Sequence, residues 1–253
     1  MTHRTLLVPI GRGAAGEAAL GTAFALAGKW GGHVVALSVR PDPRDAVYLV
    51  GEAASPGAVE AILRSAEASA ERRAAEARDQ FEGARAAAHA GGGRVSAELH
   101  EVVGQDRDHV AAFGRVADLI VVPRPDDPIG SRAAGVLEAA LFETGRPVLV
   151  APARGVAAPT GRVALLWNDG VEAARAVVGA GPFLARADRV DILVAGAGED
   201  LVASAERLAT GLGRHGVKAG VVRVAFADRD EAAALAARIA ELGANLVVMG
   251  AYG

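Results

Sequence analysis

The feature that most constrains the fold is a pattern of short apolar runs, alternating with alanine-rich stretches, that occurs twice along the chain. The runs of the first half are near-continuous and rich in β-branched residues, as expected for strands buried on both faces of a parallel sheet. They lie at residues 6–10, 34–39, 95–102, 119–122 and 148–151. The stretches between them predict helices at residues 17–30, 59–89, 107–117 and 133–144.

The same pattern restarts after residue 161. It predicts strands at residues 163–167, 190–195, 217–225 and 246–249, with helices at 172–185, 201–214 and 231–242. Because a duplicated unit of alternating strands and helices implies right-handed crossovers, each half should form a parallel sheet. We therefore predict an α/β protein with two tandem open parallel-sheet domains, each a Rossmann-like three-layer α/β/α arrangement.

The domain boundaries follow from a break in this periodicity. Residues 152–161 contain two prolines and two glycines and show no strand or helix pattern. We predict a first domain at 1–153, a linker at 154–161 and a second domain at 162–253. The second domain lacks its last helix and strand in this sequence, which stops at Gly253.

Composition excludes several classes of function. The net charge is −3, so no excess of basic residues favours a nucleic-acid partner. The chain has no cysteine, which removes disulfides, thiolate metal sites and cysteine nucleophiles together. No apolar stretch reaches the roughly 18 residues of a membrane span, and the first apolar run is too short for a signal peptide. We expect a cytoplasmic protein with no membrane partner.

The candidate binding site lies at the turns that follow the strands of the second half. In open parallel sheets, ligands bind beyond the carboxyl ends of the strands, where the strand order reverses. Met249, which ends the fourth strand, is followed by Gly250-Ala251-Tyr252-Gly253. Glycines at that spacing let backbone N–H groups approach a phosphate, although the same letters also suit a tight strand-to-helix turn.

The turn after the first strand of the second half is the other candidate. It consists of Trp167, Asn168, Asp169 and Gly170. An amide or carboxylate at this edge can hydrogen-bond a ribose or an adenine. An equally good interpretation is a helix N-cap followed by a glycine turn.

Residues 163–177 and 245–253 together resemble the universal stress protein family, and specifically its UspA-like members with two domains in tandem. The resemblance covers essentially the whole chain. It implies an open parallel sheet of the adenine nucleotide alpha hydrolase-like type. It also implies binding of ATP or a related adenine nucleotide, accompanied by Mg²⁺, through a residue after strand one and a G-x2-G-x9-G-[ST] loop after strand four. Asn168 stands where the family usually has Asp, and Gly250 and Gly253 match the first two loop glycines.

The first half departs from this family pattern. Its strand-one turn, residues 10–13, has no carboxylate or amide, and its strand-four turn contains Pro123, Pro125 and Pro128 with Asp126 and Asp127. Prolines remove backbone donors, and carboxylates repel phosphate. A Gly130-Ser131 pair is present but comes too early for the family spacing. We expect the first half not to bind ATP in the family manner and to have a structural or partner-binding role.

Three functional hypotheses follow. The leading one is a regulatory stress-response protein with an adenine nucleotide in the second half, little or no ATP hydrolysis, no catalytic residue and no metal ligand of its own. In the family the domains pair through their fifth strands, here residues 148–151, which implies pairing of the two domains or a homodimer. The alternative is a nucleotide-free scaffold that acts through protein contacts. An enzyme such as a pyrophosphatase is disfavoured, because the signature motifs of nucleotide-activating relatives are absent from the sequence.

Overall fold

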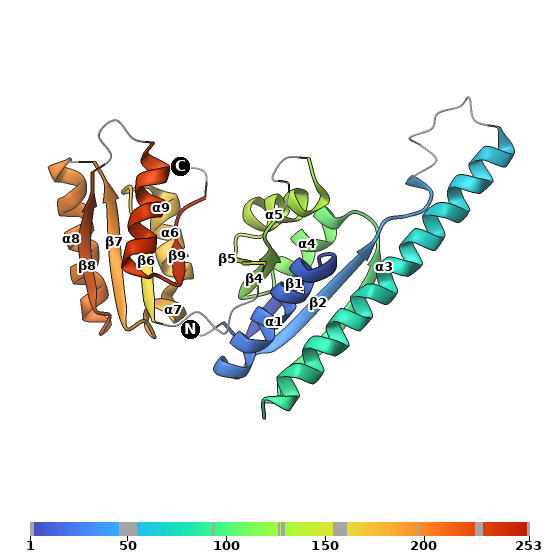
Figure 1. Cartoon of the computed structure of the whole chain (residues 1–253), viewed down its shortest axis with the longest axis horizontal. Helices are drawn as coiled ribbons and strands as arrows, with labels where there is room; N and C mark the ends of the chain where they lie inside the picture. The colour runs from blue at the N-terminus through green and yellow to red at the C-terminus, as the bar shows by residue number, and fades with distance from the viewer. Residues whose placement is uncertain are drawn as a thin grey trace. The chain divides into compact units, whose positions relative to one another are not determined.

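A computed structural model of the chain describes residues 3–45, 55–92, 94–125, 127, 130–153, 161–196, 198–225 and 230–251. The chain forms two compact units, one within residues 2–158 and one within residues 159–253. Each is an open sheet of parallel strands flanked by helices (Figure 1). The predicted α/β fold of two tandem parallel-sheet domains is therefore confirmed.

The first unit has a sheet of five parallel strands in the order β3-β2-β1-β4-β5. Its strands are β1 (Thr5–Pro9), β2 (His33–Arg40), β3 (Ser96–Val103), β4 (Leu119–Pro123) and β5 (Val148–Ala151). Its helices are α1 (Gly13–Trp30), α3 (Pro56–Ala90), α4 (Asp106–Gly114) and α5 (Arg132–Glu143). Each strand lies within two residues of the predicted one, because buried parallel strands leave a near-continuous apolar signal.

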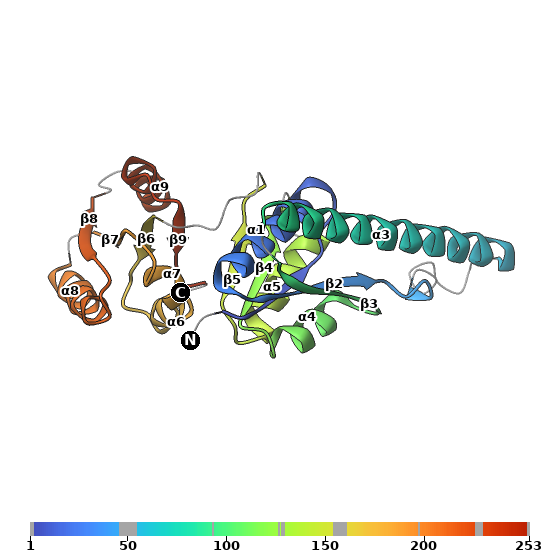
Figure 2. The ribbon, with the colours of Figure 1, turned by 90° about the horizontal axis from the view of Figure 1, so that it is seen from below.

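Helices cover both faces of this sheet. α1 and α3 pack together on one face, and α4 and α5 pack together on the other (Figure 2). Leu7, Leu37 and Ile120 are almost fully buried on the α4 and α5 side. This arrangement is the predicted three-layer order.

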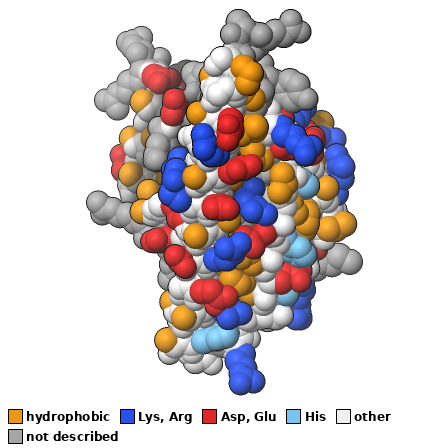
Figure 3. Space-filling model, turned by 90° about the vertical axis from the view of Figure 1, so that its right-hand side faces the viewer, with side chains coloured by type: hydrophobic (Ala, Val, Ile, Leu, Met, Phe, Trp, Pro, Cys, Tyr) orange, Lys and Arg blue, Asp and Glu red, His pale blue; other side chains and the backbone are white. Residues whose placement is uncertain are grey.

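α3 is the longest helix of the described residues. Its start is fixed by Ser55, whose hydroxyl accepts a hydrogen bond from the Ala58 N–H at 3.3 Å, and by Pro56 in the first turn. Its buried face is made of alanines, Gln80 and Phe81, whereas Figure 3 shows acidic and basic side chains interleaved on its outward face. No helix of the described residues is both long enough and apolar enough to cross a lipid bilayer.

The second unit has four described strands in the order β8-β7-β6-β9. They are β6 (Arg162–Leu166), β7 (Arg189–Ala195), β8 (Ala219–Val224) and β9 (Leu246–Val248). The helices are α6 (Val171–Gly179), α7 (Gly181–Leu184), α8 (Glu199–Arg214) and α9 (Glu231–Leu242). α6, α7 and α8 cover one face and α9 covers the other (Figure 2).

The prediction of one continuous helix at residues 172–185 was wrong. The stretch 172–185 forms two helices, α6 and α7, with a break at Ala180. Pro182 lies in the first turn of α7, and because proline has no backbone N–H it cannot continue the hydrogen bonding of the preceding helix.

The register places two turns next to each other. β6 lies between β7 and β9, with Leu166 opposite Leu193 and Leu165 opposite Val248. Because the strands are parallel, the turns that follow β6 and β9 leave the same edge of the sheet. We call the edge of each sheet at which its parallel strands end the carboxyl edge of that unit. The direction of the chain connections reverses between β6 and β9, as it does between β1 and β4 in the first unit.

Candidate functional site

The turn after β6 is anchored by Trp167. Its backbone N–H donates to the Leu193 carbonyl at 3.0 Å, and its indole Nε1 donates to the Ser204 hydroxyl at 3.1 Å. The ring packs against the core formed by β6, β7, α7 and α8. Trp167 therefore anchors the end of β6. From the sequence it was predicted only as part of the binding turn, without this structural role.

Asn168 is engaged within its own turn. Its Oδ1 accepts a hydrogen bond from the Gly170 N–H at 2.9 Å, and its Nδ2 donates to Glu172 Oε1 at 3.0 Å. The first contact is the local turn that Asn side chains commonly make, and it leads the chain into α6. The N-cap of α6 is Gly170, without a side-chain cap, so Asn168 shapes the turn ahead of the helix and is not itself an N-cap.

Asp169 is held in an uncommon backbone conformation. Its φ is 62°, in the left-handed region that Asp tolerates better than most residues. Its Oδ1 accepts a hydrogen bond from the Ser204 hydroxyl at 2.5 Å. Ser204, on α8 and only 5% exposed, thus links Trp167 to Asp169. No sequence motif identifies Ser204, because it lies far along the chain from this turn.

The turn after β9 lies against the start of α6. A Cβ atom on Gly250 would be 2.8 Å from the Ala173 nitrogen and 2.9 Å from the Glu172 carbonyl carbon, so only glycine allows this close approach. Met249, just before it, is 59% exposed. Gly253, the second predicted loop glycine, lies outside the described residues. The other five predicted site residues therefore come together at one edge of the sheet.

Glu172 is the residue of this site that the sequence did not single out. Its side chain lies between the two turns, because a Cβ on either Gly170 or Gly250 would collide with it. A hydrogen bond from its own backbone N–H, and then one from the Asn168 amide, hold the pKa of Glu172 below its usual range. A charged carboxylate thus stands at the start of α6, where a ligand phosphate would otherwise meet the positive end of the helix.

The equivalent turns of the first unit touch each other directly. A Cβ on Gly11, after β1, would be 2.8 Å from Cγ of Pro123, the last residue of β4. The Gly13 N–H at the start of α1 donates to Glu76 Oε1 at 2.9 Å. The start of the helix after strand one is therefore bonded to a carboxylate here as well.

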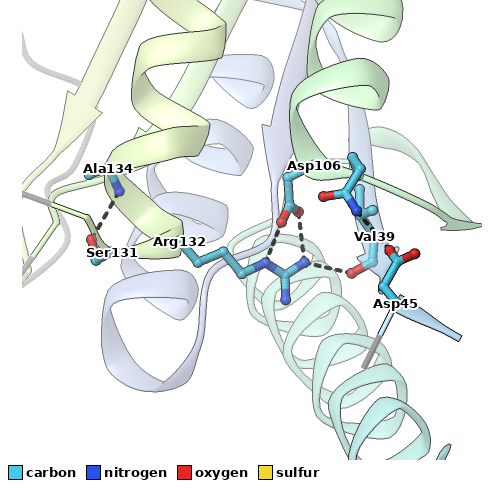
Figure 4. A network of polar contacts seen from close by, with 7 residues as sticks. Val39, Asp45, Asp106, Ser131, Arg132 and Ala134 are labelled. Atoms are coloured by element: carbon cyan, nitrogen blue, oxygen red, sulfur yellow. Dashed lines mark hydrogen bonds and ion pairs between the residues drawn. The ribbon is translucent and has the colours of Figure 1, made fainter. Parts of the chain in front are cut away.

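Arg132 lies across the carboxyl edge of the first unit (Figure 4). Its Nε and Nη2 donate to the two oxygens of Asp106, at 2.5 and 2.7 Å, and its Nη2 also donates to the Val39 carbonyl at 2.6 Å. The preceding residue, Ser131, accepts the Ala134 N–H at 3.1 Å and so caps α5. The Gly130-Ser131 pair thus stands at the start of α5, even though its sequence spacing is short, and Arg132 connects α5, α4 and β2.

The comparisons with known proteins agree with this fold. The model of the universal stress protein family matches residues 2–152. A universal stress protein of Archaeoglobus fulgidus DSM 4304 is similar in structure, with a TM-score of 0.68 at 15% identity, covering 98% of this chain and 87% of that one. A structure described as a universal stress protein of Pseudomonas aeruginosa UCBPP-PA14 has a TM-score of 0.50 at 16% identity, covering 98% of this chain and 82% of that one.

At these identities the two structures show the shared fold alone. No curated protein sequence matches the chain.

Proposed function

The chain belongs to the universal stress protein family, and from this premise we propose that it is a non-catalytic, regulatory member whose second unit holds an adenine nucleotide. The ligand would be ATP or a related nucleotide, with Mg²⁺ bound through the phosphates. The observation that carries the proposal is the meeting of two turns, residues 167–170 and 249–251, at the carboxyl edge where the chain connections reverse.

The chemistry of these turns suits a nucleotide in two ways. Gly250 packs directly against the backbone of Glu172 and Ala173, which brings the backbone of the turn after β9 beside the start of α6, the positive end of that helix. Asp169 is exposed and uses only one carboxylate oxygen in its hydrogen bond to Ser204, which leaves the other for a ribose hydroxyl or an adenine amino group.

Titration of the full-length protein with ATP and Mg²⁺ tests this proposal. We expect one nucleotide per chain, and loss of binding in Gly250→Asp, because the new side chain adds both bulk and negative charge between the turns. Gly213→Asp is the matched control, since Gly213 lies on α8 with open space around its Cα. Binding that survives Gly250→Asp, or release of phosphate from ATP at an enzymatic rate, would overturn the proposal.

A nucleotide-free scaffold is the second candidate, and Glu172 is the observation that favours it. The carboxylate already bonds the start of α6, so a phosphate must displace it or remain at a distance. Mass spectrometry of small molecules released from the denatured, purified protein separates the two candidates. A stoichiometric adenine nucleotide supports the first. Its absence, together with no heat of ATP binding, supports the scaffold.

A further inference from the structure

A groove runs between α1 and α3 on the surface of the first unit. The two helices pack side by side on one face of the sheet (Figure 2), and the groove between them has a volume of about 950 Å³. Its walls come from residues 17–24 of α1 and residues 72–88 of α3. We call it the α1–α3 groove. The nucleotide proposed for the second unit uses none of these residues.

One end of the α1–α3 groove is acidic. Glu17 and Asp79 line it from opposite sides and are exposed, and neither carboxylate has a hydrogen bond or an ion pair with another described residue. Glu76 also lines this end and accepts the Gly13 N–H at 2.9 Å. Among the described residues of the lining, Arg72 alone is basic. Three carboxylates therefore face one guanidinium, and this end of the groove carries an excess of negative charge.

The other end of the groove is apolar and has small side chains. Its lining consists of Gly21, Phe24, Gly83, Ala84, Ala87 and Ala88. A Cβ atom on Gly21 or Gly83 would meet no other atom within 4 Å, so both glycines open onto free space. With so little side-chain bulk on either wall, the backbone of another segment can approach both helices closely.

The shape of the groove suits a third helix. The lining residues of α3 recur at intervals of three and four between positions 72 and 88, so they form one stripe along the helix. At 1.5 Å per residue this stripe is roughly 24 Å long. A helix laid along it would contact α1 and α3 together, as in ordinary packing of helices whose axes lie about 8 to 10 Å apart.

We propose that the α1–α3 groove binds an amphipathic helix of a partner protein, one with small apolar residues on its inserted face and lysine or arginine beside them. Charge complementarity identifies this occupant. The carboxylates of Glu17 and Asp79 have no basic partner in the described part of the chain, and basic side chains of the bound helix supply it. The alanines and glycines at the other end receive the apolar face.

Fluorescence anisotropy of a labelled peptide, titrated with the full-length protein, tests the proposal. The probe is a helical peptide of about 18 residues, long enough to cover the groove, with alanine and leucine on one face and lysine beside them. The comparison peptide has glutamate at each lysine position. We expect saturable binding of the lysine peptide at one site per chain. The glutamate peptide should bind at least about tenfold more weakly, because its charges repel those of the groove.

Gly83→Leu should block the apolar end of the groove and weaken binding of the lysine peptide about tenfold or more, because its side chain takes the space of the bound helix. The variant should fold, since a Cβ there meets no atom within 4 Å and leucine favours a helix more than glycine does. Gly135→Leu is the matched control. It makes the same change in open space on α5, on the other face of the sheet, and should bind like the wild type.

Asp79→Asn tests the acidic end of the groove. It should weaken binding of the lysine peptide about two- to fivefold, the range for an exposed ion pair, and it should make binding less sensitive to salt. Glu67→Gln removes the same charge from an exposed position of α3 outside the groove and should change nothing. Gly250→Asp, in the second unit, should also leave peptide binding unchanged, which separates this result from the nucleotide proposal.

Three results of the titration would overturn the proposal: no saturable binding of the lysine peptide, equal binding of the two peptides, or equal binding by the wild type and Gly83→Leu. Analytical ultracentrifugation without peptide examines a second copy of the chain as the occupant. We expect the wild type and Gly83→Leu to have the same oligomeric state. A dimer of the wild type that Gly83→Leu dissociates would assign the groove to a second copy and would also overturn the proposal.

Discussion

The Glu172 side chain occupies the space that a side chain on Gly250 would need: a Cβ there would lie 2.6 Å from Glu172 Cγ. Two segments that are far apart in the sequence, the start of α6 and the turn after β9, thus fit together at a glycine. The same side chain accepts a hydrogen bond from Asn168 Nδ2 at 3.0 Å, so Glu172 contacts both turns at the carboxyl edge of the second unit.

Glu172→Gln should bind ATP more tightly than the wild type by a severalfold factor. The substitution keeps the shape of the side chain but removes a negative charge that repels phosphate at short range. Glu231→Gln, in the first turn of α9, is the matched control, since it also removes a carboxylate near a helix start. Calorimetric dissociation constants measure the effect. A weaker complex for Glu172→Gln would mean that the carboxylate assists the ligand.

Gly250→Ala should destabilise the second unit by about 1 to 3 kcal/mol, the usual range for forcing extra atoms into a packed position. The added methyl would meet backbone atoms of Glu172 and Ala173, which cannot rotate away. Gly213→Ala should instead be neutral or slightly stabilising, because Gly213 lies in the last turn of α8, where alanine keeps helical backbone better than glycine and finds open space. Denaturant midpoints of the two variants make the comparison, and equal midpoints would show that the turn adapts.

Asp191 should make the stability of the second unit depend on pH. It is 1% exposed and bonds Arg162 at 2.5 Å and Arg189 at 2.7 Å. Burial alone would raise the pKa of Asp191, but the hydrogen bonds from Arg162 and then Arg189 bring it below its ordinary value. The stabilisation is therefore complete above the ordinary pKa of an aspartate and is lost as the pH falls through the lowered value in the folded state.

Asp191→Asn tests this directly. We expect a loss of about 2 kcal/mol at neutral pH, in the range of hydrogen bonds to charged groups. Between neutral pH and about pH 3, the melting temperature should fall less steeply for the variant than for the wild type. Parallel curves would show that another carboxylate governs acid unfolding of this unit.

Ser204→Ala should loosen the turn that carries Asp169. The hydroxyl accepts from Trp167 and donates to Asp169, so its removal leaves the indole N–H without this partner and costs about 1 to 2 kcal/mol. The emission of Trp167 should shift toward that of a more solvated indole. Trp30→Phe in the same background removes the signal of the other tryptophan. Unchanged emission would show that Ser204 does not hold the turn.

The architecture was predictable because its signals are local. Strands buried on both faces leave apolar runs of a few residues, and Ser55-Pro56 marks a helix start within two letters. The break at Ala180 was also within reach, since Pro182 lacks the N–H that a continuous helix needs. The resemblance to the family was recognised from short segments of the second half. The family model matches residues 2–152, which lie in the first half, and so confirms the family from the other part of the chain.

The side-chain arrangement at the two carboxyl edges was not predictable. Arg132 bonds the Val39 carbonyl across a separation of 93 residues, and nothing in either segment indicates the other. Glu172 reads in the sequence as an ordinary acidic residue in a first helical turn. Its side chain can lie between Gly170 and Gly250 because neither glycine has a side chain in that space. This depends on how distant segments pack, which the periodicity of the sequence does not reveal.

The most direct test of the central claim is a residue-resolved NMR titration of the full-length protein with ATP and Mg²⁺. The account predicts that the largest amide shifts fall on residues 168–173 and 249–251, with no comparable change around Arg12 and Arg132. It also predicts that Gly250→Asp abolishes these shifts. Shifts confined to the first unit, or no shifts at saturating ATP, would contradict a nucleotide site in the second unit.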